Sequence, residues 1–168
     1  MLRSTEQKKS LLMWGLYSLL LLAIVLVQTV LLGKIALFGV HFDLLPLLVC
    51  AVAVFHGAEA GGMFALAAGL LWALSGGGDG SILLVCLTVC GVLCGYLCDA
   101  VLHRRTTTFL ILCLLSLLFC GFGTLLVRVF TDGVGLWGIF KVLIRTAISL
   151  PLAPGFYYLA RAIGKAGP

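Results

Sequence analysis

The sequence predicts an all-α integral membrane protein, a single domain built as a bundle of six transmembrane helices. Of its 168 residues, 62% are hydrophobic and only 10% are charged, whereas soluble domains carry about 25% charged residues. The apolar residues gather in long runs, and about 20 such residues in a helix cross the hydrocarbon of a bilayer. A water-soluble surface cannot be built from this composition, so one compact membrane domain, residues 1–168, is expected.

Six spans account for the apolar runs: residues 11–32, 35–55, 57–74, 81–102, 107–130 and 137–160. The first run has 22 residues, longer than the roughly 7–15 of a secretory signal core, and no A-x-A cleavage site follows it, so a retained helix is expected. The second span opens with His41, Asp43 and Pro46, which predicts an irregular or re-entrant start. Pro151 and Pro154 predict a kink in the sixth span.

Lysine and arginine predict how the bundle is oriented. Six spans place both termini on one side, and that side holds Arg3, Lys8, Lys9, Arg104, Arg105, Arg161 and Lys165. The connections on the other side hold only Lys34, although Arg128 and Lys141 lie near span ends. Because positive charge marks cytoplasmic loops, both termini are predicted to be cytoplasmic. The connections are too short to fold alone, so the function is expected to reside in the helices.

Small residues recur at every fourth position of the third expected span. They are Gly57, Gly61, Ala65, Gly69 and Ala73. Membrane helices associate through close backbone approach along small residues, because lipid supplies little hydrophobic drive between them. The third span is therefore predicted to pack along this seam.

A ladder of cysteines runs along the fourth expected span, at Cys86, Cys90, Cys94 and Cys98. Four-residue steps turn these thiols by about 120° and raise them by about 18 Å along a helix. Tetrahedral zinc needs four ligands within about 2.3 Å of one ion, and cysteines four apart on one helix point poorly for a disulfide. Buried cysteine behaves as a small hydrophobe. With Gly91 and Gly95 beside it, the ladder is predicted to be a second helix-packing seam.

No motif for catalysis or cofactor binding occurs in the chain. The sequence lacks H-E-x-x-H, G-x-S-x-G and the P-loop pattern. Its glycine run at residues 75–80 has no lysine, and its three histidines fall on separate connections. We therefore expect no enzyme activity, no cofactor, no metal and no nucleic-acid partner; membrane lipids are the expected surroundings.

Three cations lie in the outer half of the predicted bundle: Arg128, Lys141 and Arg145. Ionisable residues inside membranes usually face the bundle interior and pair. The acids available at this level are Asp43, Asp79 and Asp132. A structural ion-pair cluster, a contact with a partner or ligand, and snorkelling to headgroups all remain open. Arg145 lies about two turns inside its span, and we expect it to contact either Asp43 or a polar group of a partner.

Several stretches resemble the rod shape-determining protein MreD family. They are Phe38-Gly-Val-His-Phe-Asp-Leu-Leu-Pro-Leu-Leu, Phe55-His-Gly-Ala-Glu-Ala-Gly-Gly, Ala68-Gly-Leu-Leu-Trp-Ala-Leu-Ser-Gly-Gly and Gly95-Tyr-Leu. The family shows similar patterns at the start of its second span, at the following turn, at the end of the third span and within the fourth. Three positions depart from it: Phe42 replaces a proline, His56 an arginine, and Ala73 an acid. Any role that depends on that last carboxylate is in doubt for this chain.

The resemblance implies both a fold and a role. The fold would be a six-helix bundle resembling the substrate-binding subunit of energy-coupling vitamin transporters. The role would be that of a non-enzymatic scaffold for cell-wall elongation in the bacterial plasma membrane. Its implied partners are an MreC-like protein, the MreB filament and the RodA–PBP2 peptidoglycan synthase.

Two other functions are weighed against this one. A vitamin-uptake subunit of an energy-coupling transporter is the main alternative. Its family carries A-x-x-x-A on the first span, whereas this chain has one alanine between Leu19 and Gln28. A membrane-embedded lipid enzyme is the third candidate, and the shortage of acids argues against it.

Overall fold

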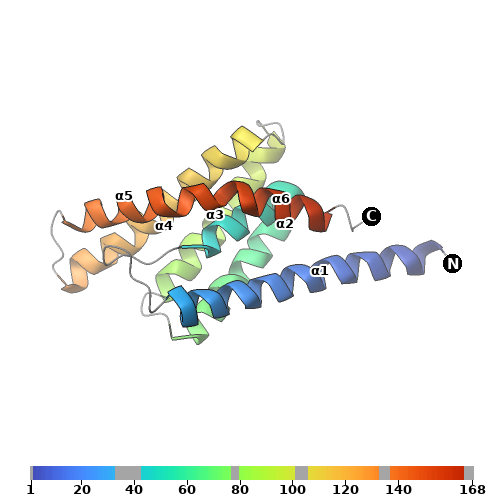
Figure 1. Cartoon of the computed structure of the whole chain (residues 1–168), viewed down its shortest axis with the longest axis horizontal. Helices are drawn as coiled ribbons and strands as arrows, with labels where there is room; N and C mark the ends of the chain where they lie inside the picture. The colour runs from blue at the N-terminus through green and yellow to red at the C-terminus, as the bar shows by residue number, and fades with distance from the viewer. Residues whose placement is uncertain (1, 33–42, 77–79, 101–105, 133–136, 165–168) are drawn as a thin grey trace.

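The computed structural model describes residues 2–32, 43–76, 80–100, 106–132 and 137–164, and no strand occurs in these ranges. The elements are α1 (Leu2–Leu26), the π-helical segment η1 (Val27–Leu32), α2 (Leu45–Leu74), α3 (Gly80–Ala100), α4 (Thr106–Asp132), α5 (Trp137–Ser149), the 3-10 turn η2 (Leu150–Leu152) and α6 (Ala153–Gly164) (Figure 1). Five helical stretches in the described ranges are long and apolar enough to cross a membrane. The predicted all-helical membrane class is confirmed at this level.

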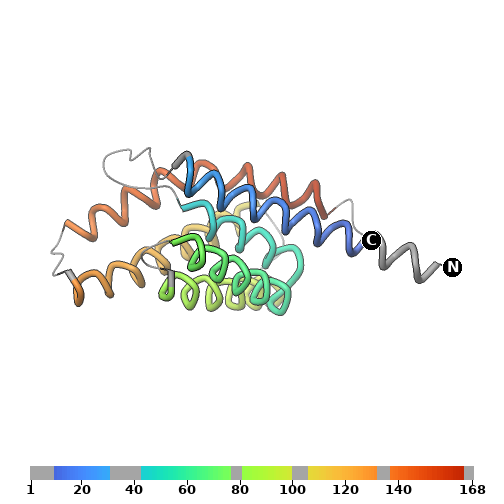
Figure 2. Tube along the Cα trace, turned by 90° about the horizontal axis from the view of Figure 1, so that it is seen from below, coloured from blue at the N-terminus to red at the C-terminus, as the bar shows by residue number. Residues whose placement is uncertain are grey.

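Helix α2 doubles back on itself at Gly57. This residue has φ +85°, a left-handed conformation that glycine adopts without strain. A Cβ placed on Gly61 would lie 2.6 Å from the Cβ of Ala53, although eight residues of straight helix would separate them by about 12 Å. The tube in Figure 2 turns back at this point. We call residues 45–56 the first arm and residues 58–74 the second arm.

The first arm forms the centre of the core. Every residue from Leu45 to Val54 is buried. A helix that is apolar all round is stable only where neighbours cover every side, and α1, α3, α4 and α6 all contact α2. Asp43 and Leu44, at the predicted irregular start, precede the helix, while His41 lies outside the described residues. In the described part of the predicted second span, the helix begins at Leu45.

The second arm packs against α3 through glycines. A Cβ on Gly91 would lie 2.6 Å from the carbonyl oxygen of Gly61 and 2.8 Å from the Cβ of Ala65. A Cβ on Gly95 would lie 2.4 Å from the Ala58 backbone, and one on Gly69 would lie 2.7 Å from the Leu84 Cα. Neither helix can carry larger residues at these points without moving apart.

Two members of the predicted third-span seam need correction. Gly57 is not a helical position, because the chain reverses there. Its hydrogen side chain also makes room for Asp99, since a Cβ would lie 3.1 Å from an Asp99 carboxylate oxygen. Ala73 is exposed near the far end of the arm. The close approach between the second arm and α3 thus involves Gly61, Ala65 and Gly69.

The last span is interrupted where proline predicted a kink. Helix α5 ends at Ser149, the 3-10 turn η2 contains Pro151, and α6 starts at Ala153. Figure 2 shows the change of direction between α5 and α6. The first span also holds an irregularity, which the sequence did not predict. Helix α1 passes into the π-helical segment η1 at Val27.

Candidate functional site

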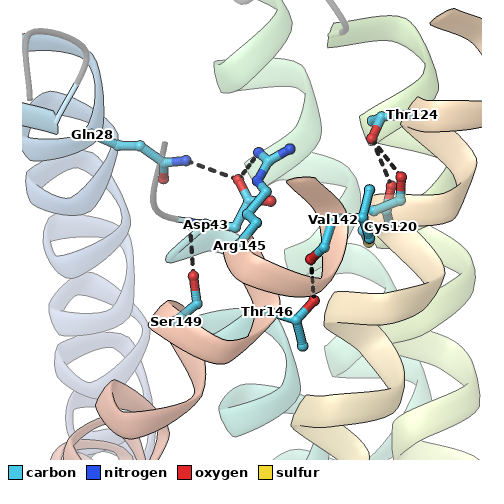
Figure 3. A network of polar contacts seen from close by, with 9 residues as sticks. Gln28, Asp43, Cys120, Thr124, Val142, Arg145, Thr146 and Ser149 are labelled. Carbon is cyan, nitrogen blue, oxygen red and sulfur yellow. Dashed lines mark hydrogen bonds and ion pairs between the residues drawn. The ribbon is translucent and has the colours of Figure 1, made fainter. Parts of the chain in front are cut away.

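An ion pair inside the helical bundle joins the start of α2 to the last span. Arg145 Nη2 donates to Asp43 Oδ1 (Figure 3). Asp43 lies two residues before the start of α2, and Arg145 belongs to α5. The Asp43 side chain is 4% exposed and that of Arg145 is 25% exposed. The contact therefore holds a partly exposed guanidinium against a buried carboxylate.

Two further polar residues contact Asp43, and we call Gln28, Asp43, Arg145 and Ser149 the Asp43 network. Gln28 Nε2 donates to Asp43 Oδ1 over 3.5 Å, the limit of a hydrogen bond. The Asp43 backbone N–H donates to Ser149 Oγ over 3.2 Å. Both residues are buried. Figure 3 shows Gln28 reaching the carboxylate from one side and Arg145 from another.

The Asp43 network lies where three helices lose their regular form. Gln28 is part of the π-helical segment η1, Asp43 precedes the first turn of α2, and Ser149 is the last residue of α5 before the 3-10 turn. Segments of π-helix occur often at functional sites. Backbone that is not α-helical persists at membrane depth only where protein or water covers it. Three such segments meet at one residue, Asp43, which makes this network the candidate site.

The other two cations of the predicted cluster are not buried. Arg128 and Lys141 are exposed, on α4 and α5 respectively. Asp132 is the last residue of α4, and Asp79 lies outside the described residues. The structure thus brings together Asp43 and Arg145, and it leaves Arg128 and Lys141 on the surface.

Sequence reasoning missed Gln28 and Ser149. The first span carries a glutamine near its end. A polar amide among leucines can indicate a buried hydrogen bond. Ser149 precedes a Leu-Pro pair. A hydroxyl at such a place can form a hydrogen bond to a backbone group near a helix end. Neither residue could be matched to Asp43 without the fold, because the contacts join positions 15 and 106 residues apart.

The cysteine ladder faces the core. All four of its cysteines are buried, and they are thiols, not disulfides. Cys94 Sγ lies 3.5 Å from Cys50 Sγ, and Cys90 Sγ lies 4.0 Å from Cys120 Sγ. Cys98 Sγ lies 3.8 Å from the carbonyl oxygen of Val54. These contacts place α3 against the first arm of α2 and against α4.

Cys86 continues the ladder at the other end. A Cβ on Gly123 of α4 would lie 2.5 Å from Cys86 Sγ, so the thiol occupies the space that glycine leaves. Among the described residues, no group of three or more His, Cys, Asp or Glu side chains could hold a metal ion. The geometry is that of side-chain packing between α3 and α4.

A second polar cluster lies at the opposite end of the first arm. The Tyr17 hydroxyl, which is fully buried, donates to the carbonyl oxygen of Ala160 over 3.2 Å. His56 Nε2 lies 3.2 Å from the hydroxyl oxygen of Tyr17. Since the hydroxyl has one proton to give, the imidazole is the donor to Tyr17. Trp14 lies against the imidazole, with ring centroids 5.5 Å apart. This cluster ties α1, α2 and α6 together.

The chemistry of the Asp43 network suits fixed recognition better than proton transfer. Arginine stays protonated in proteins, and Asp43 is held by its charge and by hydrogen bonds. A scan against protein-family models finds no match for the chain, and comparisons with curated proteins and with solved structures find none either. The function is therefore argued from the residues themselves.

Proposed function

We propose that this protein is a non-enzymatic membrane scaffold of the bacterial cell-wall elongation machinery, contributing to rod shape and peptidoglycan synthesis. It would lie in the plasma membrane and bind an MreC-like protein, and through it the MreB filament and the RodA–PBP2 synthase. The main support is the resemblance of four stretches to the MreD family. The buried pair of Asp43 and Arg145 adds to it, because Asp43 belongs to the first of these stretches.

The other resembling stretches also occupy structurally demanding places. Gly57 of the second stretch lies at the reversal of α2, and Gly95 of the fourth lies against Ala58. Gly69 of the third stretch lies against Leu84. Such positions constrain how the helices pack. Their agreement with the family's patterns supports a related bundle for this chain.

We further propose that the two arms of α2 are separate membrane segments, so that the bundle has six spans. The reversal at Gly57 and the contact between Gly61 and Ala53 support this arrangement. The first arm alone is about 18 Å long, shorter than the roughly 30 Å of hydrocarbon. The residues that precede Leu45 would complete this crossing. Both termini would then lie in the cytoplasm.

Depletion of the protein in its own rod-shaped host tests the proposed role. We expect cells to become round, and the wild-type gene supplied on a plasmid to restore rods. The tagged wild-type protein should also co-purify with the host's MreC-like protein. Cells that keep their rod shape on depletion but lose uptake of a vitamin would contradict the scaffold and favour the transporter subunit.

A further inference from the structure

Arg145 uses only part of its hydrogen-bonding capacity within the chain. A guanidinium has five N–H donors in a fixed plane. Nη2 reaches a single oxygen of Asp43, and within the described part of the chain Nε is buried without a hydrogen-bond partner. A quarter of the side chain is exposed. The ion pair therefore holds a guanidinium with one edge turned out of the bundle.

The exposed edge lies too deep for lipid headgroups to cover it easily. Helix α5 starts at Trp137, and Arg145 lies eight residues further, about 12 Å along the axis. A free arginine would snorkel toward the membrane surface, but the bond to Asp43 fixes this one. Lipid tails offer no acceptor, and an intramembrane cation normally faces a polar group. An acceptor carried by protein at the same depth meets this requirement.

The local charge indicates which acceptor fits. Lys141 lies four residues before Arg145, on the same side of α5, and it is exposed. Asp43 neutralises one of these two cations. A carboxylate would balance the second cation, and its planar oxygens match the guanidinium fork.

We propose that the exposed edge of Arg145 binds a side-chain carboxylate on a membrane-spanning helix of a partner protein, which packs along α5 beside Lys141 and Ile148. This inference rests on the proposed function, because the partner is the MreC-like protein. Asp43 has a positioning role: it holds the guanidinium in place from within the bundle. The partner helix covers the exposed donors of the guanidinium from outside.

Two variants separate this contact from the internal pair. Arg145→Lys keeps a charge for Asp43 but removes the planar fork. We expect the variant's thermal unfolding midpoint to stay within a few degrees of the wild type. The amount of MreC-like protein that co-purifies with it should fall about tenfold, as the loss of one charged hydrogen bond implies. Asp43→Leu/Arg145→Leu removes both buried charges together, so the bundle should fold and recover equally little partner. Arg128→Lys, at an exposed position of α4, is the matched control and should bind as the wild type does.

Photocross-linking tests the position of the partner helix. Benzoylphenylalanine in place of Lys141 or Ile148 should form an adduct with the MreC-like protein in cells. The same group in place of Leu143 or Ala147, on the other side of α5, should form none. Adducts only with phospholipid, or only with residues 33–42 of the same chain, would overturn the inference.

The outcomes also distinguish this inference from the proposed function. If the wild type restores rods and binds the partner, and both Arg145 variants bind equally well, only the Arg145 contact is wrong. If the wild type neither restores rods nor co-purifies with the MreC-like protein, the scaffold and the contact are both wrong.

Discussion

At the scale of single residues, the buried ion pair has the largest energetic consequence. Two charges in a low-dielectric interior are tolerated because each compensates the other, and a pair of apolar residues of similar size often replaces them at little cost. Removing one partner leaves the other charge buried and unpaired. The dependence of Asp43 on Arg145 is therefore measurable as a coupling between the two positions.

Arg145→Leu should destabilise the bundle strongly, by about 3–5 kcal/mol, because Asp43 stays behind as a buried charge. Asp43→Leu should act similarly. The double variant Asp43→Leu/Arg145→Leu should recover most of this loss, giving a large coupling energy in a double-mutant cycle. SDS titration followed by tryptophan fluorescence measures each variant. Additive losses in the double variant would show that the two side chains act independently.

Gly57 supports a second residue-scale prediction. Gly57→Ala places a Cβ at φ +85° and 3.1 Å from the Asp99 carboxylate, so we expect a loss of about 1–3 kcal/mol from strain. Gly76→Ala is the matched control for conformation, because Gly76 has φ +83° with nothing within 4 Å. Gly155→Ala, which meets no atom within 4 Å, should be close to neutral. If Gly57→Ala unfolds at the same SDS fraction as Gly155→Ala, the reversal at this residue is wrong.

At the scale of elements, the sequence predicted the apolar helices and the interruption at Pro151, but it did not predict two other irregularities. Long apolar runs predicted the helices because membrane spans depend on local composition. The π-helical segment at Val27–Leu32 and the reversal at Gly57 depend on contacts between distant segments. Glycine is common both in a four-residue ladder of small residues and in a turn, so the residue type at position 57 does not distinguish the two. The non-helical backbone of Gly57 and the position of Ala53 against Gly61 separate the two interpretations.

The contact between the second arm and α3 gives an element-scale prediction. Gly61→Leu and Gly69→Leu each put a bulky side chain where backbones meet, and overpacking costs about 1–3 kcal/mol. Thermal unfolding of the purified proteins should show lower midpoints for both. Ala73→Leu is the control, because Ala73 is exposed near the end of the same arm. Equal midpoints for Gly61→Leu and Ala73→Leu would contradict the packing of this arm on α3.

Replacing the cysteine ladder with alanines should have little effect on folding. Changing Cys86, Cys90, Cys94 and Cys98 together to alanine keeps four small residues on the buried face of α3, so the helix should still pack. We expect the variant to fold and to restore rod shape in the depleted host. Elemental analysis should find no metal bound stoichiometrically to the wild type. A metal present in the wild type and lost from the inactive variant would disprove the packing role.

At the scale of the whole molecule, the first arm of α2 is fastened at both ends to the first and last spans. The Asp43 network joins it to η1 and α5, and the Tyr17 cluster joins it to α1 and α6. The sequence could predict Asp43 and Arg145 as candidates for a pair, since buried charges need partners. It could not predict Tyr17, because an aromatic residue near a span end has an ordinary explanation at the membrane surface.

The number of membrane crossings gives a prediction for the whole molecule that depends on parity. If the two arms of α2 cross separately, the chain has six spans and both termini share a side; if α2 crosses once, five spans place them on opposite sides. We expect green fluorescent protein to fluoresce at either terminus, and alkaline phosphatase fused at the C-terminus to be inactive, since it folds only outside the cytoplasm. Phosphatase inserted in the connection at residues 133–136 should be active. An active C-terminal phosphatase together with a fluorescent N-terminal fusion would establish an odd number of spans, and the first arm would then have to be a re-entrant segment that returns to the side from which it entered.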